Sequence, residues 1–148
     1  MTNPHPKLEH VNLVVTAIEP TVAFLTAAFP DWRVRGRGDE HFAGMAREWV
    51  HVGGDNDYVA LTEYHLPAGA KGAARDLASP TPGLAHIGFE VASVDEIKAR
   101  LKKAGYEPTQ INDEHPHRRR LYFVEGDNLE FEFIEYLSDK LEEKNSYD

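Results

Sequence analysis

The sequence predicts an α+β fold in which one β-α-β-β-β module occurs twice. Two observations carry this prediction. The segments "LEHVNLVV" (8–15) and "LAHIGFEV" (84–91) place a histidine at the same point of two predicted strands. The segments 51–64 and 123–136 align without a gap, and both contain Gly-Asp-Asn and end in Glu-Tyr. Because a repeat of this kind is one structural unit per copy, each half of the chain is expected to form one module.

The repeat also predicts how the 148 residues are divided. Module one covers about 7–65 and module two about 84–137, and both are expected to belong to a single domain, 1–148. The segment between them, 66–83, is rich in Ala, Gly and Pro and is typical of a linker. A polar and charged tail, 138–148, is compatible with a short helix.

The first module shows the expected order of elements. A strand is predicted from His10 to Val15, because this segment is rich in β-branched residues. Residues 16–19 match a capping box and indicate the start of a helix. That helix has apolar residues at helical spacing, ends at Pro30 and precedes three predicted strands. Its apolar residues are Val22, Leu25, Ala28 and Phe29, and the strands are 32–37, 48–52 and 58–64.

The second module repeats this order. After the strand with His86, residues 93–96 form another capping box, and Gly105 ends the helix. The apolar residues of this helix are Ile97, Leu101 and Ala104, and the strands that follow are 106–111, 120–125 and 130–136. In both modules Gly-Asp-Asn joins the last two strands, where Asn tolerates the left-handed conformation that such turns need.

Composition excludes several classes of protein. The formal net charge of −9 argues against nucleic acid as a partner, because its phosphates would be repelled. There is no cysteine, so disulfides, thiolate metal sites and cysteine nucleophiles are excluded. The N-terminal segment lacks the apolar region of a signal peptide, and no apolar run reaches the ~20 residues of a membrane span. The sequence therefore predicts a soluble, cytoplasmic protein that has no membrane partner.

The basic run Arg118–Arg120 stands out in this acidic composition. Asp113, Glu114 and Glu125 are close to it in the sequence. Arginines among acidic residues form surface ion pairs or bind an anion, and the sequence leaves both interpretations open.

The alternation of side chains along a strand indicates which residues share a face. In the first strand of each module, His10 and His86 point away from the apolar face that the helix must cover. In the last predicted strand the two phenylalanines belong under the helix, so Glu130 and Glu132 are expected on the histidine side. Two related modules packed about a pseudo-twofold axis would bring both histidines and one glutamate together.

The duplicated order of elements, the two histidines and the segment "RRRLYFVEGDNLEFEFIEY" (118–136) resemble the vicinal oxygen chelate superfamily. This superfamily includes glyoxalase I, extradiol dioxygenases, fosfomycin- and bleomycin-resistance proteins and methylmalonyl-CoA epimerase. The resemblance covers roughly residues 7–137. It implies a glyoxalase/bleomycin resistance/dioxygenase-like fold, in which a half-open sheet forms a cup with the helices outside. It also implies a small-molecule substrate or ligand and, as in many relatives, a homodimer.

The resemblance further implies a metal site. Matched through the Gly-Asp-Asn turn, the liganding glutamate is Glu132, and the ligands on the first strands are His10 and His86. The ion would be divalent, namely Fe(II), Mn(II), Ni(II) or Zn(II). The gapless repeat places Ala60 where glyoxalase I has its fourth ligand, and the nearby Glu63 falls on the helix-covered face. Glyoxalase I itself is therefore disfavoured.

Two histidines and one carboxylate form a facial triad with open coordination positions, as in the extradiol dioxygenases of this superfamily. These enzymes also have a tyrosine on the strand before the glutamate, and Tyr122 stands in a similar place. Either Tyr122 or Phe123 faces the cup. If Tyr122 does, the matching residue of module one is Val50, and His51 points toward the helix. If Phe123 does, His51 lines the cup.

The resemblance implies a divalent-metal-dependent enzyme of the glyoxalase/dioxygenase type that acts on a small substrate with vicinal oxygens. The reaction would be dioxygenase-like, or that of a lyase or isomerase. Tyr122 would donate a hydrogen bond or a proton, and Asn12 and His51 are the candidates for contact with the substrate. The alternative is a non-catalytic, small-molecule-binding module of the bleomycin-resistance type. The complete triad favours the enzyme, whereas the missing fourth ligand favours the binding module.

Overall fold

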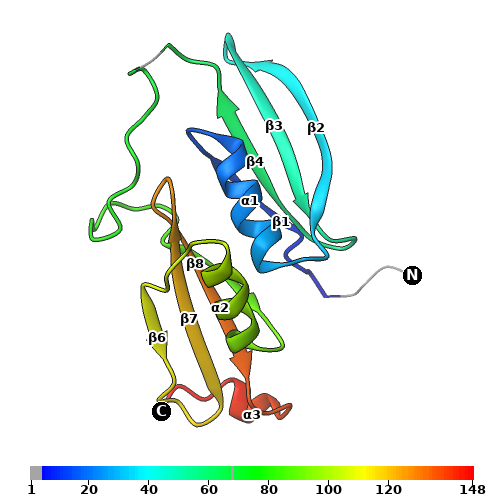
Figure 1. Cartoon of the computed structure of the whole chain (residues 1–148), viewed down its shortest axis with the longest axis vertical. Coiled ribbons are helices and arrows are strands. Elements are labelled where there is room, and N and C mark those ends of the chain that lie inside the picture. Colours follow the sequence, from blue (N-terminus) through cyan, green and yellow to red (C-terminus); the bar gives the residue numbers. More distant parts are fainter. Residues whose placement is uncertain (1–4, 68) are drawn as a thin grey trace. The chain divides into compact units, whose positions relative to one another are not determined.

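The computed structural model describes residues 5–67 and 69–148. The chain divides into two compact units, Met1–Ala73 (unit 1) and Ala74–Asp148 (unit 2). Each unit contains one four-stranded sheet, against which one longer helix packs (Figure 1). The α+β class and the two β-α-β-β-β modules predicted from the sequence are therefore confirmed.

The sheet of unit 1 has the strand order β1-β4-β3-β2. Strand β1 is parallel to β4, and the other neighbours are antiparallel. The elements are β1 (His10–Val14), α1 (Ile18–Ala28), β2 (Arg33–Phe42), β3 (Met45–Gly53) and β4 (Tyr58–Tyr64). The described residues of the predicted linker, 66–83, contain neither a helix nor a strand.

The sheet of unit 2 repeats this plan in the order β5-β8-β7-β6, and β5 is parallel to β8. The elements are β5 (His86–Glu90), α2 (Val94–Lys103), β6 (Gln110–Asn112), β7 (Arg118–Glu125), β8 (Leu129–Tyr136) and α3 (Leu141–Lys144). The short α3 lies in the polar tail. In the part of the chain that the structure describes, no helix is long and apolar enough to cross a membrane.

Helix α1 packs against β3 and β4 and covers one face of the sheet in unit 1. The predicted helix residues Leu25 and Ala28 are fully buried, whereas Val22 and Phe29 are only partly buried. The remaining buried residues of α1 are Ile18, Thr21 and Phe24. The buried stripe therefore lies about one residue away from the predicted one, because Thr21 and Phe24 contribute to it.

Helix α2 packs against β7 and β8 in unit 2. Ile97 and Leu101 on the helix are buried, as are Phe131 and Phe133 on the sheet face that the helix covers. Ala104, which was predicted to share the apolar helix face, is exposed because it is the C-cap residue. The glycine that follows it has a positive φ of 95° and ends the helix as predicted.

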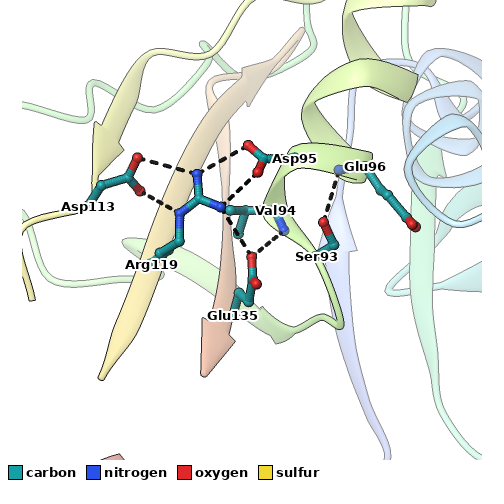
Figure 2. A network of polar contacts seen from close by, with 7 residues as sticks. All are labelled: Ser93, Val94, Asp95, Glu96, Asp113, Arg119 and Glu135. Atoms are coloured by element: carbon teal, nitrogen blue, oxygen red, sulfur yellow. Dashed lines mark hydrogen bonds and ion pairs between the residues drawn. The ribbon is translucent and has the colours of Figure 1, made fainter. Parts of the chain in front are cut away.

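The N-terminus of each helix is held by a glutamate from the last strand of its sheet. The backbone N–H of Ile18 donates to Glu63 Oε2 at 3.0 Å, and that of Val94 donates to Glu135 Oε2 at 3.0 Å (Figure 2). The capping box predicted at 16–19 is wrong, since the N-cap residue is Ala17 and has no capping side chain. The predicted cap at Ser93 is confirmed, because its hydroxyl accepts from the N–H of Glu96 at 3.3 Å.

The hairpin between β2 and β3 is longer than the sequence predicts. Its turn is formed by Ala43 and Gly44, which both have positive φ angles, 52° and 77°. Such a turn usually contains Asn-Gly or Asp-Gly, so the sequence Ala-Gly did not indicate a hairpin turn at this point. The polar sequence of β2 also hid the extension of the predicted strand 32–37 to residue 42.

We call the sheet face opposite the helix the helix-free face. In unit 1, this face carries His10, Asn12, His51, Tyr58 and Ala60, and in unit 2 it carries His86, Gly88, Tyr122, Glu130 and Glu132.

Candidate functional site

The hairpins that precede the last strand of each unit differ by one residue. In unit 1 the loop 54–57 joins β3 to β4, and in unit 2 the loop 126–128 joins β7 to β8. Asn128 takes a positive φ of 55°, as the predicted turn requires, but Asn56 is not among the described residues with positive φ. A shift of 72 residues therefore relates β4 to β8, whereas a shift of 71 relates β3 to β7.

This difference decides which side chains share the helix-free face. Tyr122 lies opposite Glu132, so Tyr122 and not Phe123 faces this side. His51 lies opposite Ala60 and also faces this side, whereas Val50 is buried on the helix-covered face. The prediction that a cup-facing Tyr122 turns His51 toward the helix is wrong, because the gapless repeat assumed hairpins of equal length.

The structure brings three of the predicted residues together in unit 2. His86 Nε2 lies 3.0 Å from Glu132 Oε2, and the Tyr122 hydroxyl donates to Glu132 Oε1 at 2.6 Å. Strands β5, β8 and β7 are adjacent and supply one residue each. The second acidic residue, Glu130, lies 3.5 Å from His86 Nδ1 through its Oε1. We call His86, Tyr122 and Glu132 the unit 2 cluster.

Burial and a hydrogen bond determine the protonation of Tyr122 in this cluster. Glu132 is 7% exposed and Tyr122 9% exposed, whereas the side chain of His86 is 40% exposed. Burial, followed by the hydrogen bond to Glu132, raises the pKa of Tyr122 to about 12. The hydroxyl is therefore protonated at neutral pH and acts as a fixed donor to the carboxylate.

Gly88 leaves space next to the carboxylate. It lies opposite Glu132 in the parallel pair of β5 and β8. A Cβ atom at this position would lie 3.8 Å from Glu132 Oε2 and 3.6 Å from Ile134 Cδ1. A side chain at position 88 would therefore contact Glu132 Oε2, the oxygen that faces His86, whereas glycine places no side-chain atom there.

The predicted residues of unit 1 form a ring stack. The His10 ring stacks on Tyr58 with centroids 4.8 Å apart, and the His51 ring stacks on Tyr58 at 4.5 Å. Trp49 lies beside His51 at 4.8 Å, and the Arg35 guanidinium lies over Tyr58 at 4.6 Å. Burial lowers the pKa of His51, and the charges of His10 and Arg35 act in the same direction. His51 is therefore neutral at pH 7 and can accept a proton.

Other predicted positions in unit 1 occupy the expected faces. Asn12 is exposed on the helix-free face, and its Oδ1 accepts from the Thr62 hydroxyl at 3.0 Å. Ala60 lies between Asn12 and His51 in the sheet and is 2% exposed. Glu63 is on the opposite face, where it holds the helix and Lys71. Ala60 thus holds the place in β4 that Glu132 holds in β8, as the repeat predicted, and alanine offers no ligand atom.

A second group of ligand-type side chains was not predicted from the sequence. The ligand atoms of Asp39, Glu48 and His65 all lie within 4.8 Å of one another, and the three residues are exposed or partly exposed. Asp39 faces Glu48 across β2 and β3, and Arg37 lies 3.5 Å from Glu48. The group belongs to the helix-covered side of the sheet, since Glu48 pairs with Glu63. Only the length of β2, which the sequence did not show, places these residues together.

The sequence matches a known family model over most of its length. Residues 7–133 match the model of the Glyoxalase/Bleomycin resistance protein/Dioxygenase superfamily. The chain belongs to this superfamily. No curated protein sequence matches it significantly.

Solved structures of superfamily proteins share the fold. A glyoxalase/bleomycin resistance protein/dioxygenase domain from Frankia sp. EAN1pec is 26% identical with a TM-score of 0.70, over 89% of this chain and 98% of that one. Glyoxalase I of Leishmania major is 18% identical with a TM-score of 0.64, over 88% and 87% of the two chains. The fosfomycin resistance protein FosX from Listeria monocytogenes, solved with Mn(II) and sulfate, is 24% identical with a TM-score of 0.59, over 95% and 98%.

The superfamily to which the chain belongs includes metal-dependent enzymes. FosX was solved with Mn(II), and the Leishmania protein is a glyoxalase I. At these identities the likeness concerns the fold alone, so the ligands and the substrate of this chain have to be argued from its own residues.

Proposed function

We propose that the protein is a divalent-metal-dependent enzyme that acts on a small substrate with two neighbouring oxygens. The observation that carries this proposal is the unit 2 cluster. A buried carboxylate has one oxygen fixed by a tyrosine and the other 3.0 Å from a histidine nitrogen. Gly88, which lies opposite Glu132, places no side-chain atom beside the second oxygen.

The donor set fits a divalent cation. Imidazole and carboxylate ligands suit Mn(II), Fe(II), Ni(II) and Zn(II). Two such ligands at about 2.1 Å from one ion and at right angles lie about 3 Å apart, as His86 Nε2 and Glu132 Oε2 do. His10 is proposed as the third ligand, because it holds the position in the repeat that His86 holds in unit 2.

The residues of the chain have separate tasks in this proposal. A bound cation would supply a Lewis acid for two neighbouring substrate oxygens. Tyr122 keeps Glu132 in one orientation. Because its pKa is raised to about 12, the hydroxyl keeps its proton and donates a hydrogen bond to the carboxylate. His51, whose pKa is lowered, is the proposed proton acceptor. Asn12 is proposed to contact the substrate from the same helix-free face of unit 1.

The substitution of a ligand by Ala60 favours a three-ligand centre. Such a centre has more open positions than a four-ligand one and accepts two substrate atoms and a further small molecule. Dioxygenase-like chemistry predicts oxygen consumption with a catechol, whereas lyase or isomerase chemistry predicts metal-dependent turnover without oxygen.

The first test is metal binding followed by an activity screen. The protein is purified anaerobically, stripped with a chelator and titrated with Fe(II), Mn(II), Ni(II) and Zn(II). We expect about one tightly bound ion per chain in the wild type and loss of binding in Glu132→Gln, with Glu142→Gln, in the exposed part of the tail, as the charge-matched control. The preferred ion then selects the substrates for the screen. Equal binding by the wild type and Glu132→Gln would contradict the proposal.

A second candidate function is ligand binding without chemistry. The ring stack of His10, Tyr58 and His51 favours it, because stacked rings offer a flat surface to an aromatic ligand. This function predicts binding of an aromatic ligand that is independent of metal and is weakened in Tyr58→Ala. Turnover of any substrate that stops on chelation would exclude it.

A further inference from the structure

We propose that Arg120 forms an anion-binding subsite next to the unit 2 cluster, so that the substrate is a small acid. This inference rests on the proposed function and names the chemical class of its substrate. Beside its two neighbouring oxygens, the substrate carries an oxyanion group such as a carboxylate, phosphate, phosphonate or sulfate. The basis is the different surroundings of three consecutive arginines in β7.

The first two arginines make hydrogen bonds within unit 2. Arg119 lies on the helix-covered face and donates to both oxygens of Asp95, at 2.8 and 3.1 Å, and to Asp113 at 3.2 and 3.4 Å (Figure 2). Arg118 donates to the backbone oxygens of Lys144 and Ser146 in the tail, at 3.3 and 2.8 Å. Both guanidinium groups therefore stabilise the fold.

Arg120 differs from its two neighbours. Within residues 5–67 and 69–148 the side chain of Arg120 has neither a hydrogen bond nor an ion pair. Its Nε is buried without a partner, as is that of Arg118, but Arg118 has partners at both of its other nitrogens. Ile134 lies opposite it on β8, so no carboxylate faces it there. A partly buried guanidinium has a high cost of desolvation, which a bound oxyanion offsets through charge-assisted hydrogen bonds.

The position of Arg120 connects it to the unit 2 cluster. Arg120 and Tyr122 are two residues apart on the same strand and share the helix-free face, with Cα atoms about 7 Å apart. The Arg120 charge is close enough to act on the Tyr122 hydroxyl, where it opposes the raised pKa of that group. We therefore place Arg120 where it can bind an anionic group of a small substrate that lies next to Glu132.

Two amide side chains extend the subsite. Across β6 and β7, Asn112 pairs with Arg120, and Gln110 pairs with Tyr122. Gln110 Nε2 donates to Asn112 Oδ1 at 3.0 Å, which fixes the orientation of the Asn112 amide and leaves its nitrogen as a donor beside Arg120. A guanidinium and a neutral amide donor on one face form a suitable pair for an oxyanion.

The experiment first tests Arg120 without metal. Inorganic phosphate is titrated into metal-free protein, and the backbone amide resonances of β6 and β7, which are present in the wild type and in every variant, are followed by NMR. We expect saturable shifts in the wild type, affinity at least about tenfold lower in Arg120→Gln, and a smaller loss in Arg120→Lys, which keeps the charge but not the planar set of donors. Arg100→Gln, which makes the same change in net charge on the outside of α2, should bind phosphate as the wild type does. Unchanged binding in Arg120→Gln, or no binding in the wild type, would overturn the subsite.

A second arm relates the subsite to the substrate. Glycerate and 3-phosphoglycerate share neighbouring hydroxyl and carboxylate oxygens and differ in the phosphate. With Mn(II)-loaded wild type, 3-phosphoglycerate should bind at least about tenfold more tightly than glycerate, and Arg120→Gln should remove this difference. Equal affinity for the two acids would reduce Arg120 to a site for free anions and overturn the proposal. If Mn(II) does not bind but phosphate binding still depends on Arg120, the metal function fails and the anion site stands.

Discussion

At the scale of single residues, the candidate centre depends on the two oxygens of one buried carboxylate. Oε1 of Glu132 accepts from Tyr122, and Oε2 faces His86. A carboxylate that is 7% exposed needs a donor or a cation at each oxygen, because burying it without partners costs several kcal/mol. Tyr122 therefore determines which oxygen remains for a metal ion.

Replacing Tyr122 by Phe should weaken metal binding without abolishing it. The change removes the hydrogen bond to Glu132 Oε1 and lets the carboxylate rotate. Loss of such a supporting hydrogen bond lowers metal affinity roughly 10- to 100-fold. Competition with a metallochromic chelator measures this change. Tyr136→Phe, on the same face of β8, is the control and should bind metal normally; equal affinity in both variants would show that Tyr122 does not orient the ligand.

At the scale of elements, a one-residue difference between two hairpins decides the composition of the helix-free faces. The sequence repeat correctly placed Ala60 and Glu132 at equivalent points of β4 and β8. It could not place His51 and Tyr122, because the pairing across a hairpin depends on the loop, and the loops 54–57 and 126–128 differ in length. Structurally, His51 is the counterpart of Tyr122.

The helix ends show the same limit of local sequence patterns. The motif at 93–96 forms its cap, but the similar motif at 16–19 does not, and Glu63 from a distant strand takes its place. Contacts between residues 45 positions apart are not visible in a local motif. The pair Glu63 and Glu135 is nevertheless visible in the repeat, as two Glu-Tyr endings.

Replacing Glu63 by Gln should lower the free energy of unfolding at neutral pH and make it less dependent on pH between pH 3 and pH 7. Burial raises the pKa of Glu63, but the hydrogen bonds from Lys71 and Ile18 outweigh it, so the pKa lies below the ordinary value. Near pH 4 the unfolded chain therefore binds more protons at Glu63 than the folded protein does. The stabilisation is complete above the pKa that Glu63 has in the unfolded chain, and it is lost as pH falls through the lower pKa of the folded protein. We expect a loss of about 1 kcal/mol at pH 7.

Urea unfolding of the wild type and Glu63→Gln between pH 3 and pH 7 measures this effect. Glu142→Gln, in the exposed part of the tail, is the charge-matched control. The difference between wild type and Glu63→Gln should shrink toward pH 3. A constant difference over the whole range would show that the charge of Glu63 plays no part.

Replacing Arg119 by Gln should destabilise unit 2 selectively. Arg119 connects three parts of unit 2 (Figure 2). It pairs with Asp95 of α2, with Asp113 in the segment before β7, and with Glu135 of β8. Because Asp95 and Asp113 are largely exposed, the expected loss is only about 1 kcal/mol. Hydrogen exchange should become faster at amides of α2 but not of α1. Arg33→Gln, which removes a single exposed ion pair with Asp55, should change neither helix.

At the scale of the whole molecule, two units with one plan carry different chemistry on their helix-free faces. Unit 1 presents rings and His51, whereas unit 2 presents Glu132, Tyr122 and Arg120. The fold class, both modules and the faces of the histidines followed from the repeat and from strand alternation. The sequence left open whether the run Arg118–Arg120 binds an anion, and it could not single out one arginine. Only the tertiary contacts show that Arg118 and Arg119 make hydrogen bonds, whereas Arg120 makes none among the described residues.

The most direct test of the central claim is the metal content of four variants beside the wild type, measured after reloading with Mn(II) and desalting. We expect about one ion per chain in the wild type and nearly none in His86→Ala, Glu132→Gln and His10→Ala. Loss of a ligand should lower metal affinity by more than the roughly 10- to 100-fold effect of losing a supporting hydrogen bond. Asp39→Asn, which alters the other group of ligand-type side chains, should retain the ion. Loss of Mn(II) in Asp39→Asn with retention in Glu132→Gln would contradict the account and move the metal site to the helix-covered side of unit 1.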